Sequence, residues 1–245
     1  MSGSSITNGV FGVFYVSDLG NSTNTQFLEI MIMIICYQTI KSFFIQSQHR
    51  LTDTGYKKEI YPEGKVPALK YGQEVIPESM IIVELLHDLY PTAKLFTTAD
   101  PGRKAKMKFA IGLFEDQVLS ANRKLLDTRP ITRESFDVYV ETISSLYRRF
   151  NGLLLEQSST GPYFLGSQYS AVDIALAPFV FQVSTFAKLL TGKNFEVLDD
   201  LPRLRTFLES IVNHPVCQET GHLNEERFSN VAIERFGVTR NMFVK

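Results

Sequence analysis

The stretch KVPALKYGQEVIPES, residues 65–79, decides the fold that we expect for this chain. Two short β-prone runs, Val66–Lys70 and Glu74–Ile76, flank a Tyr71-Gly72 turn signal, a pattern that is typical of a β-hairpin. Pro67 cannot donate to a strand ladder, so the first run lies at a sheet edge or irregularity. A backbone donor and acceptor are then left beside this proline, where a ligand with its own peptide backbone could pair as one more strand.

A helix is expected directly after the hairpin. Pro77-Glu78-Ser79 opens the run Met80–Tyr90, whose apolar positions recur at helical spacing. Glu78 and Ser79 therefore stand at a helix N-terminus, where free amide hydrogens and the helix dipole favour a carboxylate, while Glu78 could accept an ammonium. These features fit a small peptide with an amino-acid end. A hairpin that feeds a capped helix in any α/β domain explains the same pattern.

The residues before the hairpin extend it into an α/β domain. Val10–Ser17 is typical of a strand, Phe27–Tyr37 of an apolar helix, and Ile40–Gln46 of a second strand. The resulting order, β-α-β-β-α, matches a thioredoxin-like domain with a mixed sheet, which we expect over residues 1–95. Thr97–Gly102 supplies a linker that contains proline and glycine.

Long helical patterns follow, and residues 96–245 are expected to form an all-helical bundle. The expected helices are Arg103–Leu126, Glu134–Gln157, Ala171–Leu190, Leu201–Asn213 and Asn224–Arg235. The first two are joined by a short connection and should form an antiparallel pair. Ser170 and Asp173 have the spacing of a capping box, which nucleates a helix and is not a catalytic acid.

Composition limits the classes of function. The chain has 245 residues and a formal net charge of −1, so charge gives no argument for nucleic acid. Cys36 and Cys217 are the two cysteines, and no leader pattern precedes residue 10, so we expect a reduced, cytoplasmic protein. The apolar run Ile30–Cys36 is too short for a membrane span, which needs roughly 20 residues. The histidines show no metal-ligand spacing, so no metal is expected.

Two strings resemble the cytosolic glutathione transferases. GKVPAL, a turn, and ES before a helix that ends in LYP resemble the glutathione-binding half of that family, in its theta-like and etherase-like members. GSQYSAVDIALAPF, with Pro178 followed by Phe179, resembles the helical half of omega-like members. The resemblance covers residues 10–215 and implies a glutathione S-transferase, with glutathione as co-substrate and a homodimeric assembly.

The resemblance also implies glutathione-binding roles for residues in and around the hairpin. Val66 would pair with the cysteinyl backbone of glutathione ahead of a cis Pro67, and Glu78 and Ser79 would bind the γ-glutamyl end. Lys65 is a further contact, as in theta-like members. His49 resembles a histidine that helps to bind the glycine carboxylate, and the neighbouring Arg50 is an alternative.

Ser22 is the expected catalytic residue. The string STNT, residues 22–25, resembles the SPNT segment of serine-type members, with threonine where proline is usual. A hydroxyl at a helix N-terminus lowers the pKa of a thiol, roughly 8.5 when free, enough to make the thiolate abundant. Asn24 is a second contact to the sulfur, and Ser17 and Thr25 are competing donors. A cluster of Ser, Thr and Asn before a helix is also an ordinary cap and turn.

The predicted reaction is addition of the glutathione thiolate to a small hydrophobic electrophile, in detoxification or secondary metabolism. Phe109, Leu113 and Phe114 are candidates to line the electrophile site, although a buried stripe at helical spacing explains them equally well. A non-catalytic glutathione-binding or ligand-carrier protein on the same fold is the alternative. Thiol transfer through Cys36 is a third hypothesis, disfavoured because an apolar helix buries a thiol and keeps it inert.

Overall fold

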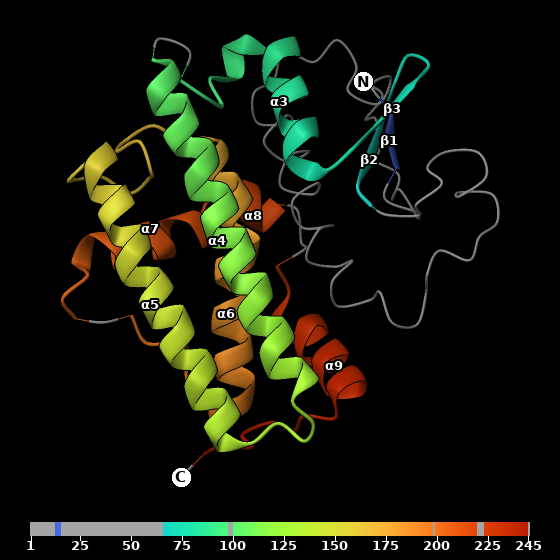
Figure 1. Cartoon of the computed structure of the whole chain (residues 1–245), viewed down its shortest axis with the longest axis vertical. Coiled ribbons are helices and arrows are strands. Elements are labelled where there is room, and N and C mark those ends of the chain that lie inside the picture. The colour runs from blue at the N-terminus through green and yellow to red at the C-terminus, as the bar shows by residue number, and fades with distance from the viewer. Residues whose placement is uncertain (1–12, 16–65, 98–99, 198, 220–222, 245) are drawn as a thin grey trace. The chain divides into compact units, whose positions relative to one another are not determined.

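The computed structural model describes residues 13–15, 66–97, 100–197, 199–219 and 223–244 (Figure 1). The chain divides into two compact units, residues 1–94 and residues 95–245, which we call the N-terminal unit and the helical unit. The expected helix Phe27–Tyr37 and strand Ile40–Gln46 lie outside the described residues.

A mixed sheet and a helix make up the described part of the N-terminal unit. β1 (Val13–Tyr15) pairs in parallel with β2 (Ala68–Tyr71), and β2 pairs antiparallel with β3 (Glu74–Pro77). The two loop residues between β2 and β3 begin with Gly72, whose φ of 59° is readily adopted without a Cβ atom. The predicted hairpin is therefore confirmed.

Helix α3 (Ser79–Leu89) follows β3 and is succeeded by the short 3₁₀ helix η2 (Pro91–Ala93). Ile82, Val83 and Leu86 share one face of α3 and are fully buried, as are Ala68 and Leu69 of β2. α3 packs against β2 and β3, so these apolar side chains hold the helix on the hairpin. The predicted helix from Met80 to Tyr90 is confirmed with a shift of one residue at each end.

Six helices lie in the described part of the helical unit: α4 (Pro101–Asp127), α5 (Arg133–Gln157), α6 (Ala171–Thr191), α7 (Pro202–Val212), α8 (Pro215–Glu219) and α9 (Glu225–Phe236). α4 and α5 lie side by side and run antiparallel, as expected from their short connection (Figure 1). The sequence analysis missed α8. α8 begins at Pro215, which the sequence analysis took as the end of a helix. Proline is accommodated at the first position of a helix, because the N–H group there has no carbonyl partner in the helix.

α6 forms the centre of the helical unit and packs against α4, α7 and α9. Every residue from Ala171 to Val180 is buried. Among the described helices α6 alone is long and apolar enough to cross a membrane by length and composition, but 78% of that window is buried, as in the core helix of a bundle. Beside it, the ring of Phe150 contacts those of Phe114 and Phe207, at centroid distances of 5.2 and 5.4 Å.

Asp173 fixes the start of α6. Its Oδ2 accepts hydrogen bonds from the backbone N–H and the hydroxyl of Ser170, at 2.7 and 2.6 Å, and its Oδ1 accepts from the backbone N–H of Phe164 at 2.7 Å. The carboxyl is fully buried, and this burial raises its pKa to about 7 against the opposing effect of these hydrogen bonds. The predicted cap is confirmed, with a structural role, because all three donors belong to the chain that leads into α6.

Candidate functional site

The peptide bond between Val66 and Pro67 is cis, as the resemblance implies. Pro67 is buried and Val66 is half-buried. Ala68, the next residue, pairs with Val13 of β1 on one side and with Pro77 of β3 on the other. The backbone of Val66 therefore lies just beyond the paired part of β2.

The register of the hairpin brings two predicted pairs of contact residues to one place. Because Ala68 is the partner of Pro77, the residues that precede Ala68 and those that follow Pro77 emerge at the same end of the hairpin. Val66-Pro67 and Glu78-Ser79 are these residues. We call this end of the hairpin, with the first turn of α3, the hairpin–helix corner.

Glu78 makes a sharp turn at the hairpin–helix corner. Its φ of 70° and ψ of 119° lie in a region that residues with a side chain rarely adopt, at a cost on the order of 1–3 kcal/mol. Its side chain is exposed and caps no backbone N–H of α3, while its carbonyl accepts the N–H of Ile82 at 3.0 Å. Nothing in the sequence indicates this conformation, since glycine or asparagine is the usual residue at positive φ.

Ser79 is the first residue of α3, and it is nearly buried. The first N–H groups of a helix lack carbonyl partners in the preceding turn, and the helix dipole places partial positive charge there. The first turn of α3 contains no acidic residue that would neutralise this charge. This end of α3 is therefore suited to a carboxylate from a ligand.

The remaining predicted contacts to glutathione lie outside the described residues. They are Ser22, Asn24, His49 and Lys65, together with the alternatives Ser17, Thr25 and Arg50. Their roles stay predictions.

The three candidate residues for the electrophile site differ in their surroundings. Phe109 is 51% exposed, with the guanidinium of Arg149 lying 5.9 Å from its ring centroid, and Leu113 is half-buried. Phe114 is fully buried, and its ring stacks on that of Tyr147 at 6.2 Å. Phe114 belongs to the core of the helical unit, and its role at the electrophile site stays a prediction. The roles of Phe109 and Leu113 stay predictions.

The described thiol is not suited to nucleophilic chemistry. Cys217 is buried, and its Sγ donates to the carbonyl of Ile211 at 3.0 Å. Burial raises the pKa of this thiol to about 12, so the thiolate is scarce at neutral pH. Within the described ranges, no group of three or more His, Cys, Asp and Glu side chains lies close enough together to hold a metal ion.

The chain is similar to proteins from plants. "Protein IN2-1 homolog B" from Oryza sativa subsp. indica is 28% identical over 158 residues, which cover 64% of this chain and 59% of that protein. "Glutathione S-transferase L3" from Arabidopsis thaliana is 30% identical over 156 residues, covering 64% of this chain and 60% of that protein. Residues 133–210 match the family model described as "Glutathione S-transferase, C-terminal domain". These matches support the resemblance to the cytosolic glutathione transferase superfamily.

Solved structures of glutathione transferases share its fold. The Tau class enzyme from mango, Mangifera indica, matches 86% of this chain and 93% of its own length with a TM-score of 0.63, at 16% sequence identity. The predicted fold class, a thioredoxin-like domain followed by a helical bundle, is confirmed. The chain spans about three fifths of the length of the two plant relatives, which are covered to 59% and 60%.

Proposed function

We propose that this chain is a glutathione transferase, which binds glutathione at the hairpin–helix corner and adds its thiolate to a small hydrophobic electrophile. The observation that carries the proposal is the β2–β3 register, which brings Val66-Pro67 and Glu78-Ser79 to the same end of the hairpin. A peptide ligand that pairs with the Val66 backbone would then have its amino-acid end at the start of α3.

Each residue of the corner supports a different part of glutathione in this proposal. The backbone of Val66 pairs with the cysteinyl residue as one more strand. The hydroxyl of Ser79 and the free amides of α3 hold the γ-glutamyl carboxylate, and the carboxylate of Glu78 accepts the ammonium group. Lys65 and His49 are further proposed contacts.

The proposed chemistry needs no covalent intermediate on the protein. Ser22 donates a hydrogen bond to the sulfur, with Asn24 as a second contact, and this favours the thiolate over the thiol. The sulfur forms a bond to an electrophilic carbon. In a substitution, a leaving group such as chloride departs from that carbon with its bonding electron pair; in an addition to an activated double bond, the electron pair of the double bond moves to the neighbouring atom, which takes up a proton from water. Phe109 and Leu113 are proposed to contact the electrophile. A cytoplasmic location and a homodimer are part of the proposal.

The test of catalysis is the rate of conjugation of glutathione to chlorodinitrobenzene by the parent chain and by Ser22→Ala. Loss of one donor to a developing or stabilised anion lowers turnover by roughly 100- to 1,000-fold, with glutathione affinity nearly unchanged. Ser17→Ala and Thr25→Val are the matched controls and should retain turnover. If one of them loses turnover and Ser22→Ala does not, the catalytic assignment moves to that residue.

The test of binding is calorimetric titration of glutathione into the parent chain and into Ser79→Ala. A lost hydrogen bond to a charged group weakens binding by roughly tenfold or more. Ser120→Ala, at an exposed position of α4, is the control and should bind as the parent does. Glutathione binding without turnover on several electrophiles would favour the ligand-carrier alternative. The absence of glutathione binding by the parent chain would overturn the proposal.

A further inference from the structure

A cavity of about 380 Å³ lies in the helical unit between α6, α9 and the segment that follows α9. Its volume falls within the range of roughly 300–1,000 Å³ that is usual for sites of small ligands. α6 contributes Thr185 and Lys188 to its lining, α9 contributes Glu226 and Ser229, and Arg240 comes from the segment after α9. The cavity contains none of the residues that we assign to glutathione.

Two side-chain hydroxyl groups in this cavity have no hydrogen-bond partner in the described part of the chain. Thr185 is 3% exposed and Ser229 is 4% exposed, and neither hydroxyl has a partner among the described residues. Thr142, Thr191 and Thr206, by contrast, each donate to the carbonyl four residues earlier in their own helix. The Thr185 hydroxyl is therefore free to bond a group inside the cavity.

A buried amide extends this polar face of α6. Gln182 stands three residues before Thr185, so both lie on one face of the helix. It is 1% exposed, and within the described part of the chain neither its amide nitrogen nor its amide oxygen has a partner. A buried amide that is left without hydrogen-bond partners destabilises the fold. The two unsatisfied atoms of Gln182 indicate that water or another polar group lies beside this amide, which is a neighbour of the cavity and not part of its lining.

Two of the four charged residues that line the cavity form an ion pair with each other, and the other two have no ion pair in the described part of the chain. Lys188 Nζ lies 2.6 Å from the Glu225 carboxylate, so these two charges largely neutralise each other. Glu226 and Arg240 have no ion pair in the ranges that the structure describes, and Arg240 makes one long hydrogen bond, 3.4 Å, to Asn230. The carboxylate of Glu226 and the guanidinium of Arg240 are therefore available to pair with a ligand.

We propose that this cavity binds a small zwitterion of the α-amino acid class. Its carboxylate pairs with Arg240, its ammonium pairs with Glu226, and its remaining polar atoms bond the hydroxyls of Thr185 and Ser229. A dianion would be repelled by the carboxylate of Glu226, which has no cation beside it in the described part of the chain. A cation without a carboxylate would leave the charge of Arg240 without a partner. This site is separate from the hairpin–helix corner and does not depend on the proposed transferase activity.

The test uses L-serine as the probe, titrated into the full-length protein while binding is followed by heteronuclear NMR. We expect saturable binding, with cross-peak shifts in α6 and α9. N-acetyl-L-serine lacks the ammonium and L-serine methyl ester lacks the carboxylate, so each should bind at least about tenfold more weakly. Saturation by either derivative at the same concentration as L-serine, or no saturation by L-serine, would overturn the proposal.

Variants connect the binding to this cavity. Glu226→Gln and Arg240→Gln should each weaken L-serine binding by about tenfold, because each loses one charge-assisted contact. Glu234→Gln, an exposed position of α9 that does not line the cavity, is the control and should bind as the parent does. Because glutathione is itself zwitterionic, the titrations are repeated with glutathione present. If glutathione displaces L-serine from the parent chain but not from Ser79→Ala, then L-serine binds at the hairpin–helix corner, and the cavity assignment is overturned.

Discussion

Glu78 holds the junction between β3 and α3 at a φ of 70°, which its own side chain disfavours. Glu78→Gly should raise the free energy of unfolding by up to about 1 kcal/mol, because the relieved strain exceeds the added entropy of glycine in the unfolded chain. The same variant should bind glutathione more weakly, because the proposed partner of the ammonium is lost. Urea denaturation and calorimetry measure the two effects.

Glu74→Gly is the matched control for this prediction. Glu74 is an exposed residue of β3, where glycine weakens a strand. Its substitution should therefore lower stability and leave glutathione affinity unchanged. A loss of stability in Glu78→Gly as large as that in Glu74→Gly would contradict the idea that Glu78 is strained.

Asp173 predicts a pH dependence of stability. Burial raises the pKa of its carboxyl from 3.8 to about 7, so between these values the folded chain holds a proton that the unfolded chain releases. The contribution of this group to stability is fully present below pH 3.8 and is lost as pH rises through about 7. Asp173→Asn, although less stable, should lack this decline. Urea denaturation at a series of pH values measures it, and parallel pH profiles for the two proteins would refute the prediction.

At the scale of elements, the segment after α9 contacts the end of α6 and the start of α5. The backbone N–H groups of Asn241 and Phe243 donate to the carbonyls of Leu189 and Leu190, both at 2.8 Å, in the last turn of α6. The Phe243 ring stacks on Phe136 of α5 at a centroid distance of 5.6 Å. These contacts satisfy carbonyl groups that the end of a helix leaves without partners.

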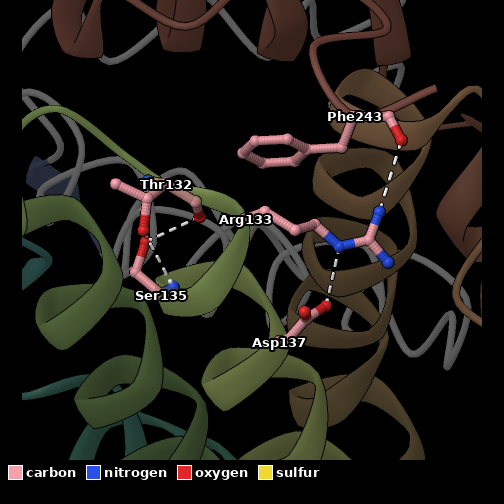
Figure 2. A network of polar contacts seen from close by, with 5 residues as sticks. All are labelled: Thr132, Arg133, Ser135, Asp137 and Phe243. Atoms are coloured by element: carbon pink, nitrogen blue, oxygen red, sulfur yellow. Dashed lines mark hydrogen bonds and ion pairs between the residues drawn. The ribbon is translucent and has the colours of Figure 1, made fainter. Parts of the chain in front are cut away.

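Arg133 joins the same segment to the first turn of α5. Its Nη1 donates to the carbonyl of Phe243 at 3.3 Å, and its Nε donates to Asp137 at 2.9 Å (Figure 2). Thr132 and Ser135 cap this helix by reciprocal hydrogen bonds, of which Ser135 N–H to Thr132 Oγ1 is 3.2 Å. The segment therefore contacts a helix start and a helix end at once.

Phe243→Ala should lower the free energy of unfolding by roughly 1–3 kcal/mol, because the aromatic contact with Phe136 is lost and the helix end is less well covered. Met242→Ala is the control, since Met242 is 39% exposed, and should change stability by less than about 0.5 kcal/mol. Urea denaturation followed by circular dichroism measures both. Equal effects of the two substitutions would show that the segment contributes nothing specific.

The elements could be predicted where a periodic pattern and a cap signal agree. The apolar spacing of Met80–Tyr90 and the Ser170–Asp173 spacing both placed their helices correctly. The helical spacing of Phe109, Leu113 and Phe114 does not distinguish the lining of a substrate site from a buried stripe, and only the structure shows that Phe114 packs on Tyr147. The φ of Glu78 and the cavity beside Thr185 depend on how elements meet, which sequence spacing does not show.

At the scale of the whole molecule, the described parts of the two units have apolar cores of different size. The described core of the N-terminal unit rests on a few residues of β2 and α3, among them Leu69, Ile82 and Leu86. The helical unit buries large aromatic side chains among its own helices, such as Phe114 against Phe150 and Phe150 against Phe207. Each fully buried aromatic or aliphatic side chain contributes roughly 1.5–3 kcal/mol. The helical unit therefore contains most of the stabilising burial that the structure describes.

A fragment of residues 95–245 should accordingly fold by itself. Because the aromatic contacts just described join helices within this unit, we expect a helical circular dichroism spectrum and a single cooperative urea transition. The fragment should not bind glutathione, since the hairpin–helix corner lies in the other unit, but it should still bind L-serine at the α6–α9 cavity. A fragment without a cooperative transition would show that the helical unit depends on the N-terminal unit for its fold. A folded fragment that binds glutathione would instead place the glutathione site on the helices and exclude the hairpin–helix corner as its location.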